Sequence, residues 1–495
     1  MICVSVGRGR HQMMIAEYNL LADQGAELVE LRLDFIRRAV NLKRILEGKP
    51  CPVVATVRRP KDGGKWTRTE DERLMLLRSA VASGVDYVDL EYDIADKIPR
   101  YGKTRRIVSY HNYDETPSNL AKIHKQLQKL DPDIIKIATK ANDPIDNFRA
   151  LRLCRDSSIP TVAFCMGEMG VMSRVLCGRF GAPMTYASFN DDRQIAPGQL
   201  SFKKMQDVYR FDEITPNTKI LGVIADPVEH SFSPRVHNAC LRKLKIDMLY
   251  LPFRVPAEYL DEFVKCSPEM GIRGLSVTIP HKETVLKSLN KVNADVAAIK
   301  AANTVVFKDD KAFGFNTDCD AAVSCVLNHL ELDPEVELPL EGTTVCILGA
   351  GGVARAIVFG LKQQGATVKI SARDPEQAKI LAKEMGCGTL DWENRENHNC
   401  LILVNCTPVG MHPEMDETPF DQEWHDRNVV VFDTVYNPER TLLIKQAREA
   451  GCKTITGIDM FVRQASKQFE LFTGKRADDE VVRYEVKRAT SAARY

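Results

Sequence analysis

The sequence predicts an α/β protein in which an N-terminal (β/α)8 TIM barrel precedes a two-lobed α/β unit with a Rossmann-type nucleotide-binding domain. Three observations carry this prediction. The chain has 495 residues, which is enough for two or three domains. Eight short apolar runs alternate with helix-like stretches in the first 210 residues, and a glycine-rich turn follows a strand-like run near residue 349.

The composition is that of an ordinary globular enzyme. Lys+Arg 68 against Asp+Glu 67 gives a formal net charge of +1 without long blocks of either sign, so we expect no nucleic-acid partner. Hydrophobic residues make up 44% and charged residues 27%, which argues against disorder. No segment approaches the length of a membrane span, and the first apolar run is too short for a signal peptide, so we expect no membrane partner.

The cysteine pattern points to free thiols. The 14 cysteines are scattered from Cys3 to Cys452, with no Cys-x-x-Cys pair and no His/Cys cluster at zinc spacing. We therefore expect no metal site and a location in the reducing cytoplasm.

Eight β-branched, apolar runs predict the barrel strands: Ile2–Val6, Leu28–Leu33, Val53–Val57, Tyr87–Glu91, Ile107–Tyr110, Ile134–Ala138, Thr161–Cys165 and Met184–Ser188. Stretches between them, such as Glu70–Ser83 and Ser118–Leu130, carry apolar residues at helical spacing beside charges. Eight strand-helix units of this kind are typical of a (β/α)8 barrel.

Polar residues near the carboxyl ends of these strands are the candidate chemistry, because active sites of such barrels lie at that end. They are Glu30, Arg32, Arg58, His111 and Lys136, with Arg174 in the loop after the seventh strand.

Each of these residue types has a functional and an ordinary interpretation. Lys136 is flanked by isoleucines, so it is either a low-pKa amine that forms a Schiff base or a lysine that extends outward to solvent. His111 is either a general acid/base or a hydrogen-bonded structural residue. The arginines either hold a carboxylate or make surface ion pairs.

The first half resembles type I 3-dehydroquinate dehydratase over residues 1 to 205. The motifs that carry the resemblance are Glu30-Leu-Arg32-Leu-Asp34, Arg58…Gly63-Gly64, Ser109-Tyr-His111, Ile135-Lys136-Ile137, Ser173-Arg174 and Ala196-Pro-Gly-Gln199.

That resemblance implies an imine between Lys136 and the C3 ketone of 3-dehydroquinate. It also implies that His111 removes the C2 proton and protonates the departing C1 hydroxyl. Asp62 occupies the position of a glutamate that orients the histidine, and Ile195 that of a common serine. The implied substrate-holding residues are Glu30, Arg32, Arg58, Arg174 and Gln199.

A second α/β pattern begins after a linker predicted over Phe211–Thr218, with a strand at Lys219–Ile224. Further along, the strand Thr343–Leu348 runs into Gly349-Ala-Gly351-Gly-Val-Ala354, and a helix follows over Ala354–Gln364. Strand, glycine turn and helix are the context in which this motif binds the pyrophosphate of a dinucleotide.

The residue that follows the next strand, Ala366–Ser371, indicates which dinucleotide is bound. Arg373 lies 24 residues after Gly349 and suits the 2′-phosphate of NADP. Asp374 stands next to it, where its charge either repels that phosphate or points to solvent.

Other polar residues of the second half gather in Asp226–Pro234, Ser276–Lys282, Ala302–Thr304 and Asn316–Asp318. Hydroxyls, an amide, a lysine and an aspartate together fit a small polyhydroxylated acid. The same residues would also serve as helix caps and turns.

These segments resemble shikimate dehydrogenase over residues 219 to 485, as do Asn405–Met411, Asp433–Pro438 and Gly457…Gln464-Ala465. The resemblance implies that Lys282 and Asp318 are the catalytic pair for NADPH-dependent reduction of 3-dehydroshikimate. The implied substrate contacts are Ser231, Ser233, Thr278, Asn303, Tyr436 and Gln464. The residues expected to contact NADP are Gly349, Ala350, Gly351, Gly352, Val353, Ala354, Ala372, Arg373, Thr407 and Gly457.

We therefore expect a fusion of the two enzymes that converts 3-dehydroquinate through 3-dehydroshikimate to shikimate. The expected domains are 1–210 for the barrel, 219–323 completed by 457–490 for the substrate-binding domain, and 324–456 for the NADP-binding domain. Two alternatives stay open, a metabolite-sensing regulator with reduced activity and a quinate dehydrogenase activity in the second half. The sequence does not determine the oligomeric state.

Overall fold

The computed structural model describes residues 1–229, 231–396, 399–420 and 428–490, and the chain divides into two compact units. The first comprises Met1–Lys219 and Asp247–Val255, and the second comprises Ile220–Ile246 and Pro256–Tyr495.

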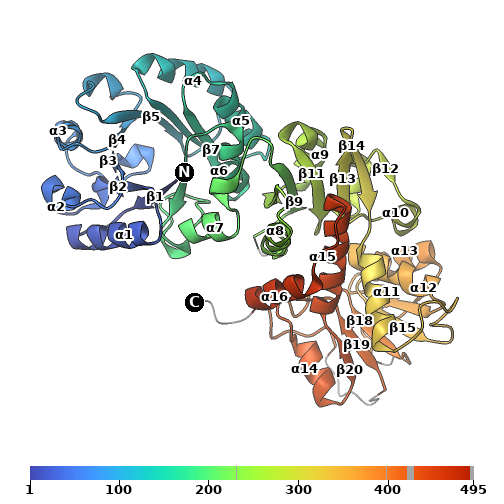
Figure 1. Ribbon diagram of the computed structural model, residues 1–495. Helices are drawn as coiled ribbons and strands as arrows, with labels where there is room; N and C mark the ends of the chain where they lie inside the picture. The colour runs from blue at the N-terminus through green and yellow to red at the C-terminus, as the bar shows by residue number, and fades with distance from the viewer. Residues whose placement is uncertain (230, 397–398, 421–427, 491–495) are drawn as a thin grey trace. The chain divides into compact units, whose positions relative to one another are not determined.

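Eight parallel strands form the centre of the first unit, and Figure 1 shows them curled into a ring within a layer of helices. The order of hydrogen-bonded neighbours is β7-β6-β5-β4-β3-β2-β1-β8. The barrel is therefore nearly closed, with β7 and β8 as the two strands at the ends of the sheet. Every strand lies within two residues of its predicted bounds, which confirms the barrel. The strands are β1 (Ile2–Val6), β2 (Leu28–Arg32), β3 (Val53–Thr56), β4 (Tyr87–Glu91), β5 (Arg105–Asn112), β6 (Ile134–Lys140), β7 (Thr161–Met166) and β8 (Thr185–Ser188).

The helices of this unit are α1 (His11–Asp23), α2 (Leu42–Leu46), α3 (Glu70–Ala82), α4 (Leu120–Leu127), α5 (Asp146–Asp156), α6 (Val171–Leu176) and α7 (Phe202–Asp207). A capping box starts α3, because Thr69 and Glu72 bond each other's backbone amides at 3.3 and 3.0 Å. This start directs Arg73, on the first turn, into the core. Arg174 was expected in a loop, and it lies instead on the short helix α6.

The first sheet of the second unit has the strand order β10-β9-β11-β13-β14-β12. β9 and β11 are parallel, whereas β13 and β14 form an antiparallel hairpin. By residue contacts β10 is grouped with the first unit, although it is the edge strand of this sheet. The elements are β9 (Lys219–Ala225), β10 (Met248–Arg254), β11 (Ile272–Val277), β12 (Lys291–Val292), β13 (Thr304–Lys308), β14 (Lys311–Phe315), α8 (Ser233–Lys243), α9 (Leu260–Cys266) and α10 (Ala294–Ile299).

The second sheet is parallel throughout, with the order β17-β16-β15-β18-β19-β20. Its order reverses between β15 and β18, and ligands of such sheets bind at the carboxyl ends of the strands on either side of this point. The elements are α11 (Asp318–His329), β15 (Thr344–Leu348), α12 (Gly352–Gln363), β16 (Thr367–Ser371), α13 (Pro375–Met385), β17 (Gly388–Thr389), β18 (Ile402–Asn405), β19 (Val430–Asp433), α14 (Leu442–Glu449) and β20 (Lys453–Ile455).

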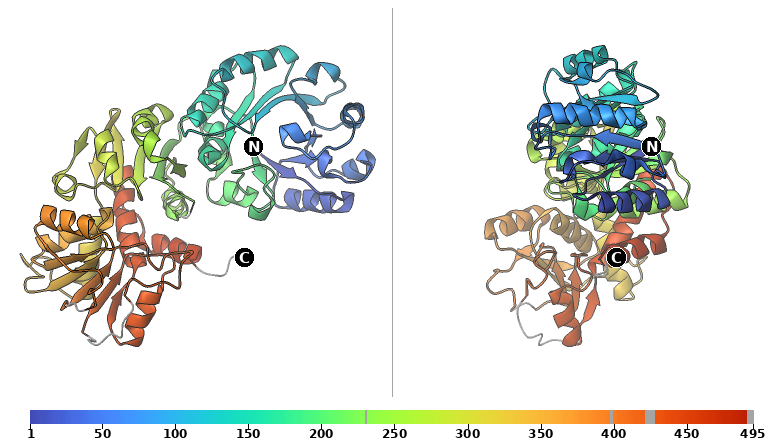
Figure 2. Two further views of the ribbon diagram at one scale, coloured as in Figure 1. Left: turned by 180° about the vertical axis from the view of Figure 1, so that it is seen from behind. Right: turned by 90° about the vertical axis from the view of Figure 1, so that its left-hand side faces the viewer.

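Two C-terminal helices complete the second unit. α15 (Gly457–Thr473) follows the last strand of the second sheet and packs against β11 and β13 of the first, and it appears as the long red helix in the left view of Figure 2. α16 (Asp479–Thr490) packs against α8. Among the described residues, no helix is both long and apolar enough to cross a bilayer.

Candidate active sites

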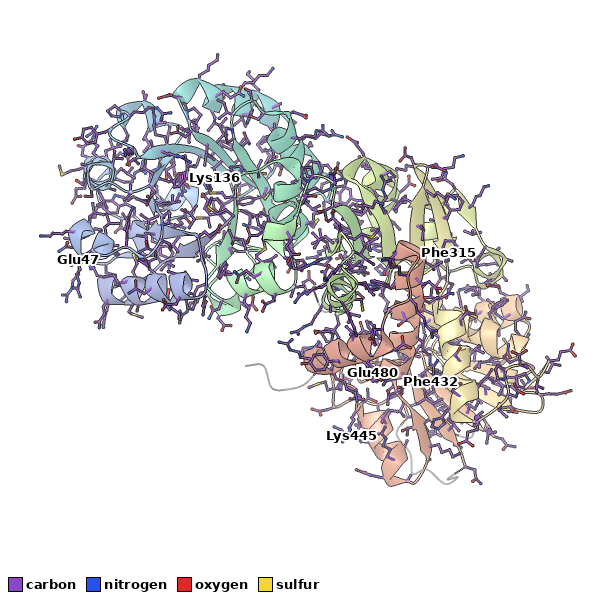
Figure 3. The ribbon with its side chains drawn as sticks, in the orientation of Figure 1. Glu47, Lys136, Phe315, Phe432, Lys445 and Glu480 are labelled. Atoms are coloured by element: carbon purple, nitrogen blue, oxygen red, sulfur yellow. The ribbon has the colours of Figure 1, made fainter. Side chains whose placement is uncertain are left out.

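A pocket in the barrel gathers all but one of the residues predicted for the first site. Figure 3 labels Lys136 among the strands of the first unit. The predicted residues that line the pocket are Glu30, Arg32, Arg58, His111, Lys136, Arg174 and Gln199, and they are joined by Ser5, Tyr113, Ala138, Phe164, Met166, Tyr186, Ile195 and Ala196.

The surroundings of the Lys136 amine are acidic. Its Nζ lies 3.0 Å from Asp89 Oδ2 and 3.5 Å from Glu30 Oε1, and 3.7 Å from the ring centroid of Tyr186. The isoleucines that flank Lys136 in the sequence do not surround this amine, because successive side chains of a strand point to opposite faces. Lys136 is 5% exposed, so its charge is held inside the barrel by carboxylates.

Arg58 connects this amine to the histidine. Its Nη2 donates to Asp89 at 2.7 Å, and its Nη1 lies 3.2 Å from Glu91 Oε1 and 3.5 Å from His111 Nδ1. Arg73 donates to the other oxygen of Glu91 at 2.7 Å. Two buried arginines and two buried carboxylates therefore form one ion-pair network beneath the pocket.

His111 is held neutral. Burial lowers its pKa well below the ordinary value, and the charges of Arg58 and Lys136 lower it further. A neutral imidazole beside a substrate is able to accept a proton.

Asp62 is the predicted residue that the structure does not bring into the pocket. Its carboxylate accepts a hydrogen bond from Arg59 Nε at 2.7 Å, and its backbone carbonyl accepts one from the Tyr113 hydroxyl at 3.3 Å. In the described part of the chain, the hydrogen-bonding neighbour of the His111 ring is Arg58. The arrangement therefore gives Asp62 no direct contact with the histidine.

Arg174 lacks a carboxylate partner among the described residues. Its Nη2 donates to the Pro197 carbonyl at 3.1 Å, its Nε has no hydrogen-bond partner, and its guanidinium lies 4.5 Å from the Phe164 ring centroid. Burial lowers the pKa of Arg174 to about 10. A buried guanidinium of this kind favours an anionic ligand.

The other predicted contacts are already hydrogen-bonded within the protein. Arg32 binds Asp34 through two nitrogens at 3.0 and 2.8 Å, and Gln199 Oε1 accepts from the Ile195 amide at 3.0 Å. These bonds fix the side chains that surround the pocket.

A second pocket lies between the two sheets of the second unit and gathers every residue predicted to contact that substrate. It is lined by Ser231, Ser233, Thr278, Lys282, Asn303, Asp318, Tyr436 and Gln464, together with Thr407 and Gly457. His230, inside the predicted Asp226–Pro234 cluster, lies outside the described residues.

The catalytic pair predicted for this pocket forms an ion pair. Lys282 Nζ donates to Asp318 Oδ2 at 2.6 Å, and both side chains are largely buried. Asn316 Oδ1, just before helix α11, accepts from the Asp318 and Cys319 amides at 3.0 and 3.3 Å. The turn before α11 thereby fixes the carboxylate that holds the lysine.

The sequence prediction missed Gln468, which connects the pocket wall. Gln468 accepts a hydrogen bond from the Ser276 hydroxyl at 2.7 Å and donates to the Asn303 carbonyl at 2.9 Å. It lies four residues after Gln464 on α15, so both occupy one face of the helix. That spacing was a usable signal.

A groove next to this pocket is lined by the glycine-rich turn and by the residues after β16. Its lining includes Gly349, Ala350, Gly351, Gly352, Val353, Ala372, Arg373 and Thr407, and it shares Lys282 and Val353 with the substrate pocket. Of the other predicted cofactor contacts, Gly457 lines the substrate pocket, whereas Ala354 is fully buried in α12.

The geometry of this groove fits a dinucleotide. Gly349 has φ +108°, a conformation that favours glycine, and a Cβ at Gly352 would lie 3.0 Å from Lys282 Cβ. Arg373 is exposed at the edge, while Asp374 accepts from the amides of Glu376 and Gln377 at 3.0 and 3.4 Å. The neighbouring carboxylate is therefore turned toward the start of α13.

Comparisons with known proteins cover both pockets. A family model described as type I 3-dehydroquinase matches residues 2–216, and one described as shikimate dehydrogenase substrate binding domain matches residues 223–305. The models for the shikimate 5'-dehydrogenase C-terminal domain and for NADP oxidoreductase, coenzyme F420-dependent, match residues 457–487 and 344–432.

Individual proteins resemble the whole chain or its second half. The chloroplastic bifunctional 3-dehydroquinate dehydratase/shikimate dehydrogenase of Arabidopsis thaliana is 36% identical over 97% of this chain and 83% of its own length. A shikimate dehydrogenase (NADP(+)) of Methanopyrus kandleri is 40% identical over 54% of this chain and 95% of its own. The structure of shikimate 5-dehydrogenase from Thermus thermophilus with NADP(H) and shikimate has a TM-score of 0.50 and 31% identity, covering 55% of this chain and 99% of that one.

Proposed function

The chain belongs to the family of bifunctional 3-dehydroquinate dehydratase/shikimate dehydrogenases, and from this premise we propose which residues carry out its two reactions. It dehydrates 3-dehydroquinate to 3-dehydroshikimate and reduces 3-dehydroshikimate to shikimate with NADPH. The product of the first reaction is the substrate of the second.

In the dehydration, Lys136 forms an imine with the C3 ketone. The amine nitrogen attacks the carbonyl carbon, the carbonyl oxygen leaves as water, and the nitrogen keeps its positive charge as a protonated imine. This cation withdraws electrons from C2, so a neutral base is strong enough to remove the C2 proton. The low pKa of His111 supports its assignment as that base.

His111 then completes the elimination. The electron pair released at C2 expels the C1 hydroxyl, which takes the proton from His111 and leaves as water. Hydrolysis of the imine returns the Lys136 amine and 3-dehydroshikimate. Arg174 binds the substrate carboxylate, and the support for this role is its buried guanidinium without a carboxylate partner among the described residues.

In the reduction, Lys282 supplies the proton and Asp318 holds the lysine in place. NADPH supplies the hydride when it is bound. Lys282 Nζ donates its proton to the C3 oxygen as negative charge develops there, and the 2.6 Å ion pair with Asp318 supports this assignment. The amides of the turn Gly349–Val353 bind the pyrophosphate, and Arg373 binds the 2′-phosphate.

We also propose the predicted domain division, 1–210, 219–323 with 457–490, and 324–456, and a cytoplasmic location. The packing of α15 and α16 against the first sheet and α8 supports the former. All 14 cysteines are free, which supports a reducing compartment. Cell fractionation tests the location.

The observation that carries the proposal is that each half brings two predicted catalytic residues, Lys136 with His111 and Lys282 with Asp318, into one pocket. The test is a coupled assay in which the full chain, 3-dehydroquinate and NADPH are mixed and NADPH oxidation is followed. We expect Lys136→Ala to abolish the coupled reaction but to retain reduction of added 3-dehydroshikimate. Lys282→Ala is expected to do the reverse. Borohydride reduction with 3-dehydroquinate should add the substrate mass to Lys136, and trapping elsewhere would contradict the imine assignment.

A further inference from the structure

A buried carboxylate of β4, which the sequence prediction did not single out, lies between the two cations of the dehydratase pocket. The Asp89 side chain is 0% exposed. Its Oδ2 accepts from Lys136 Nζ at 3.0 Å and from Arg58 Nη2 at 2.7 Å, and its Oδ1 accepts from the Ser109 hydroxyl at 2.6 Å. Both oxygens are therefore fixed, and one of them contacts the nitrogen that reacts.

The electrostatic balance keeps Asp89 charged. Burial alone would raise the pKa of this carboxyl, but the charges of Arg58 and Lys136 outweigh burial and hold the pKa below its ordinary value. The other carboxylate near the amine, Glu30, lies farther from it, at 3.5 Å. Asp89 is thus the nearest permanent negative charge to Lys136 Nζ among the described residues.

We propose that Asp89 is a further catalytic residue of the dehydration, which keeps the nitrogen of Lys136 protonated after the imine has formed. The inference rests on the proposed function of Lys136. The net step converts an ammonium and a ketone into a protonated imine and water, so the positive charge stays on the same nitrogen. The carboxylate that pairs with the ammonium therefore also pairs with the protonated imine.

This pairing decides over which pH range the imine is useful. A neutral imine withdraws electrons from C2 poorly, whereas the protonated imine is an effective electron acceptor. An opposite charge within hydrogen-bonding distance raises the pKa of a cationic group by about 1 to 3 units. Asp89 consequently extends the active range of the dehydratase toward alkaline pH.

Glu91 provides a matched control. Asp89 and Glu91 each bind one terminal nitrogen of Arg58, at 2.7 and 3.2 Å, but only Asp89 contacts Lys136. Asp89→Asn and Glu91→Gln therefore both remove a carboxylate from Arg58, and only the first removes one from the reacting nitrogen. The difference between the two variants isolates the effect on the imine.

The experiment measures kcat of dehydration against pH for the full chain and both variants. In parallel, the fraction of chains trapped by borohydride with 3-dehydroquinate is measured by intact mass. In Asp89→Asn we expect the alkaline limb of the kcat–pH profile to lie about 1 to 2 pH units lower than in wild type. We also expect the trapped fraction to decrease most strongly at alkaline pH. Glu91→Gln is expected to lower kcat without moving the limb. Asp89→Glu, which keeps the charge, should restore the limb at least in part.

Equal limbs in Asp89→Asn and Glu91→Gln would overturn the inference, as would a loss in Asp89→Asn that is the same at every pH. If Asp89→Asn does not fold, Ser109→Ala takes its place, because it frees Asp89 Oδ1 without removing a buried charge. Because loss of this hydrogen bond leaves more negative charge on Asp89 Oδ2, the limb should move in the opposite direction, toward higher pH, by a smaller amount. An unchanged limb there overturns the inference. Failure of the wild-type chain to trap substrate on Lys136 would instead contradict the proposed function itself.

Discussion

Replacing Asp433 tests how a buried carboxylate stabilises the walls of the reductase pocket. Asp433 ends β19 and is fully buried, and it accepts hydrogen bonds from Asn405 Nδ2, the Val435 amide and the Thr441 hydroxyl at 3.0, 3.0 and 2.5 Å. The adjacent Thr434–Tyr436 segment lines the substrate pocket. Asp433→Asn removes the charge while keeping the shape of the side chain.

The magnitude follows from the pKa of Asp433. Burial raises it from an ordinary 3.8 to about 6, against the effect of its hydrogen bonds. Because the folded pKa is the higher one, the stability from this group is fully present below pH 3.8 and is lost as the pH rises through 6. At about 1.36 kcal/mol per unit, the complete loss is about 3 kcal/mol, of which about 1.3 kcal/mol falls between pH 5 and pH 7.

The assay is urea denaturation at pH 5 and at pH 7, followed by residual reductase activity. Wild type should lose this stability between pH 5 and pH 7, and Asp433→Asn should not. We therefore expect the free energy of unfolding of Asp433→Asn minus that of wild type to be about 1.3 kcal/mol higher at pH 7 than at pH 5. Thr441→Val should change this pH dependence in the opposite direction, because it removes a hydrogen bond that favours the charged form. The same difference at both pH values, or the same sign in both variants, would refute the reasoning.

Three further predictions concern the sites directly. Asp318→Asn leaves Lys282 without its carboxylate, so the reductase kcat should fall about 100- to 1,000-fold. The dehydratase kcat of the same preparation is the control and should not change. A change in both activities would indicate global damage to the protein. Arg373→Ala should raise the KM for NADPH about 10- to 100-fold, because it removes charge-assisted hydrogen bonds to the 2′-phosphate. The KM for NADH, which lacks this phosphate, should rise less than twofold. Equal increases for the two cofactors would argue against a phosphate contact. Because burial and then the charges of Arg58 and Lys136 lower the pKa of His111 well below 6.5, its neutral base form should persist in acid. The acid limb of dehydratase kcat/KM should therefore lie below the ordinary 6.5 of a histidine, and a limb at 6.5 or above would contradict the assignment.

The barrel strands could be predicted because strands buried on both faces appear as continuous apolar runs. Ile2–Val6 and Tyr87–Glu91 have the predicted bounds without change. The same property hid Asp89, which lies between Val88 and Leu90 inside such a run. Its spacing of two from Glu91 places both carboxylates on one face of the strand. The partners of Asp89 lie 20 to 47 residues away in the chain and could not be chosen from the sequence.

Most of the candidate site residues could be placed in their pockets because their motifs follow strands, and strand ends meet at one edge of a sheet. Side-chain partners were less predictable. Asp62 was expected to orient His111, yet a guanidinium three residues away, that of Arg59, takes its carboxylate. Lys136 was singled out by its flanking isoleucines, which gave no sign of the two carboxylates that the barrel interior places beside its amine.

The path of α15 has a consequence for how a gene of this kind could be divided. The helix leaves the last strand of the nucleotide-binding sheet and supplies Gln464 and Gln468 to a pocket whose other walls include residues about 150 to 230 positions earlier. A fragment that ended before Gly457 would keep both sheets of the reductase but lose one wall of its substrate site. Recombination could therefore separate the dehydratase from the reductase near Lys219, whereas a cut before Gly457 would divide the substrate site of the reductase between two pieces.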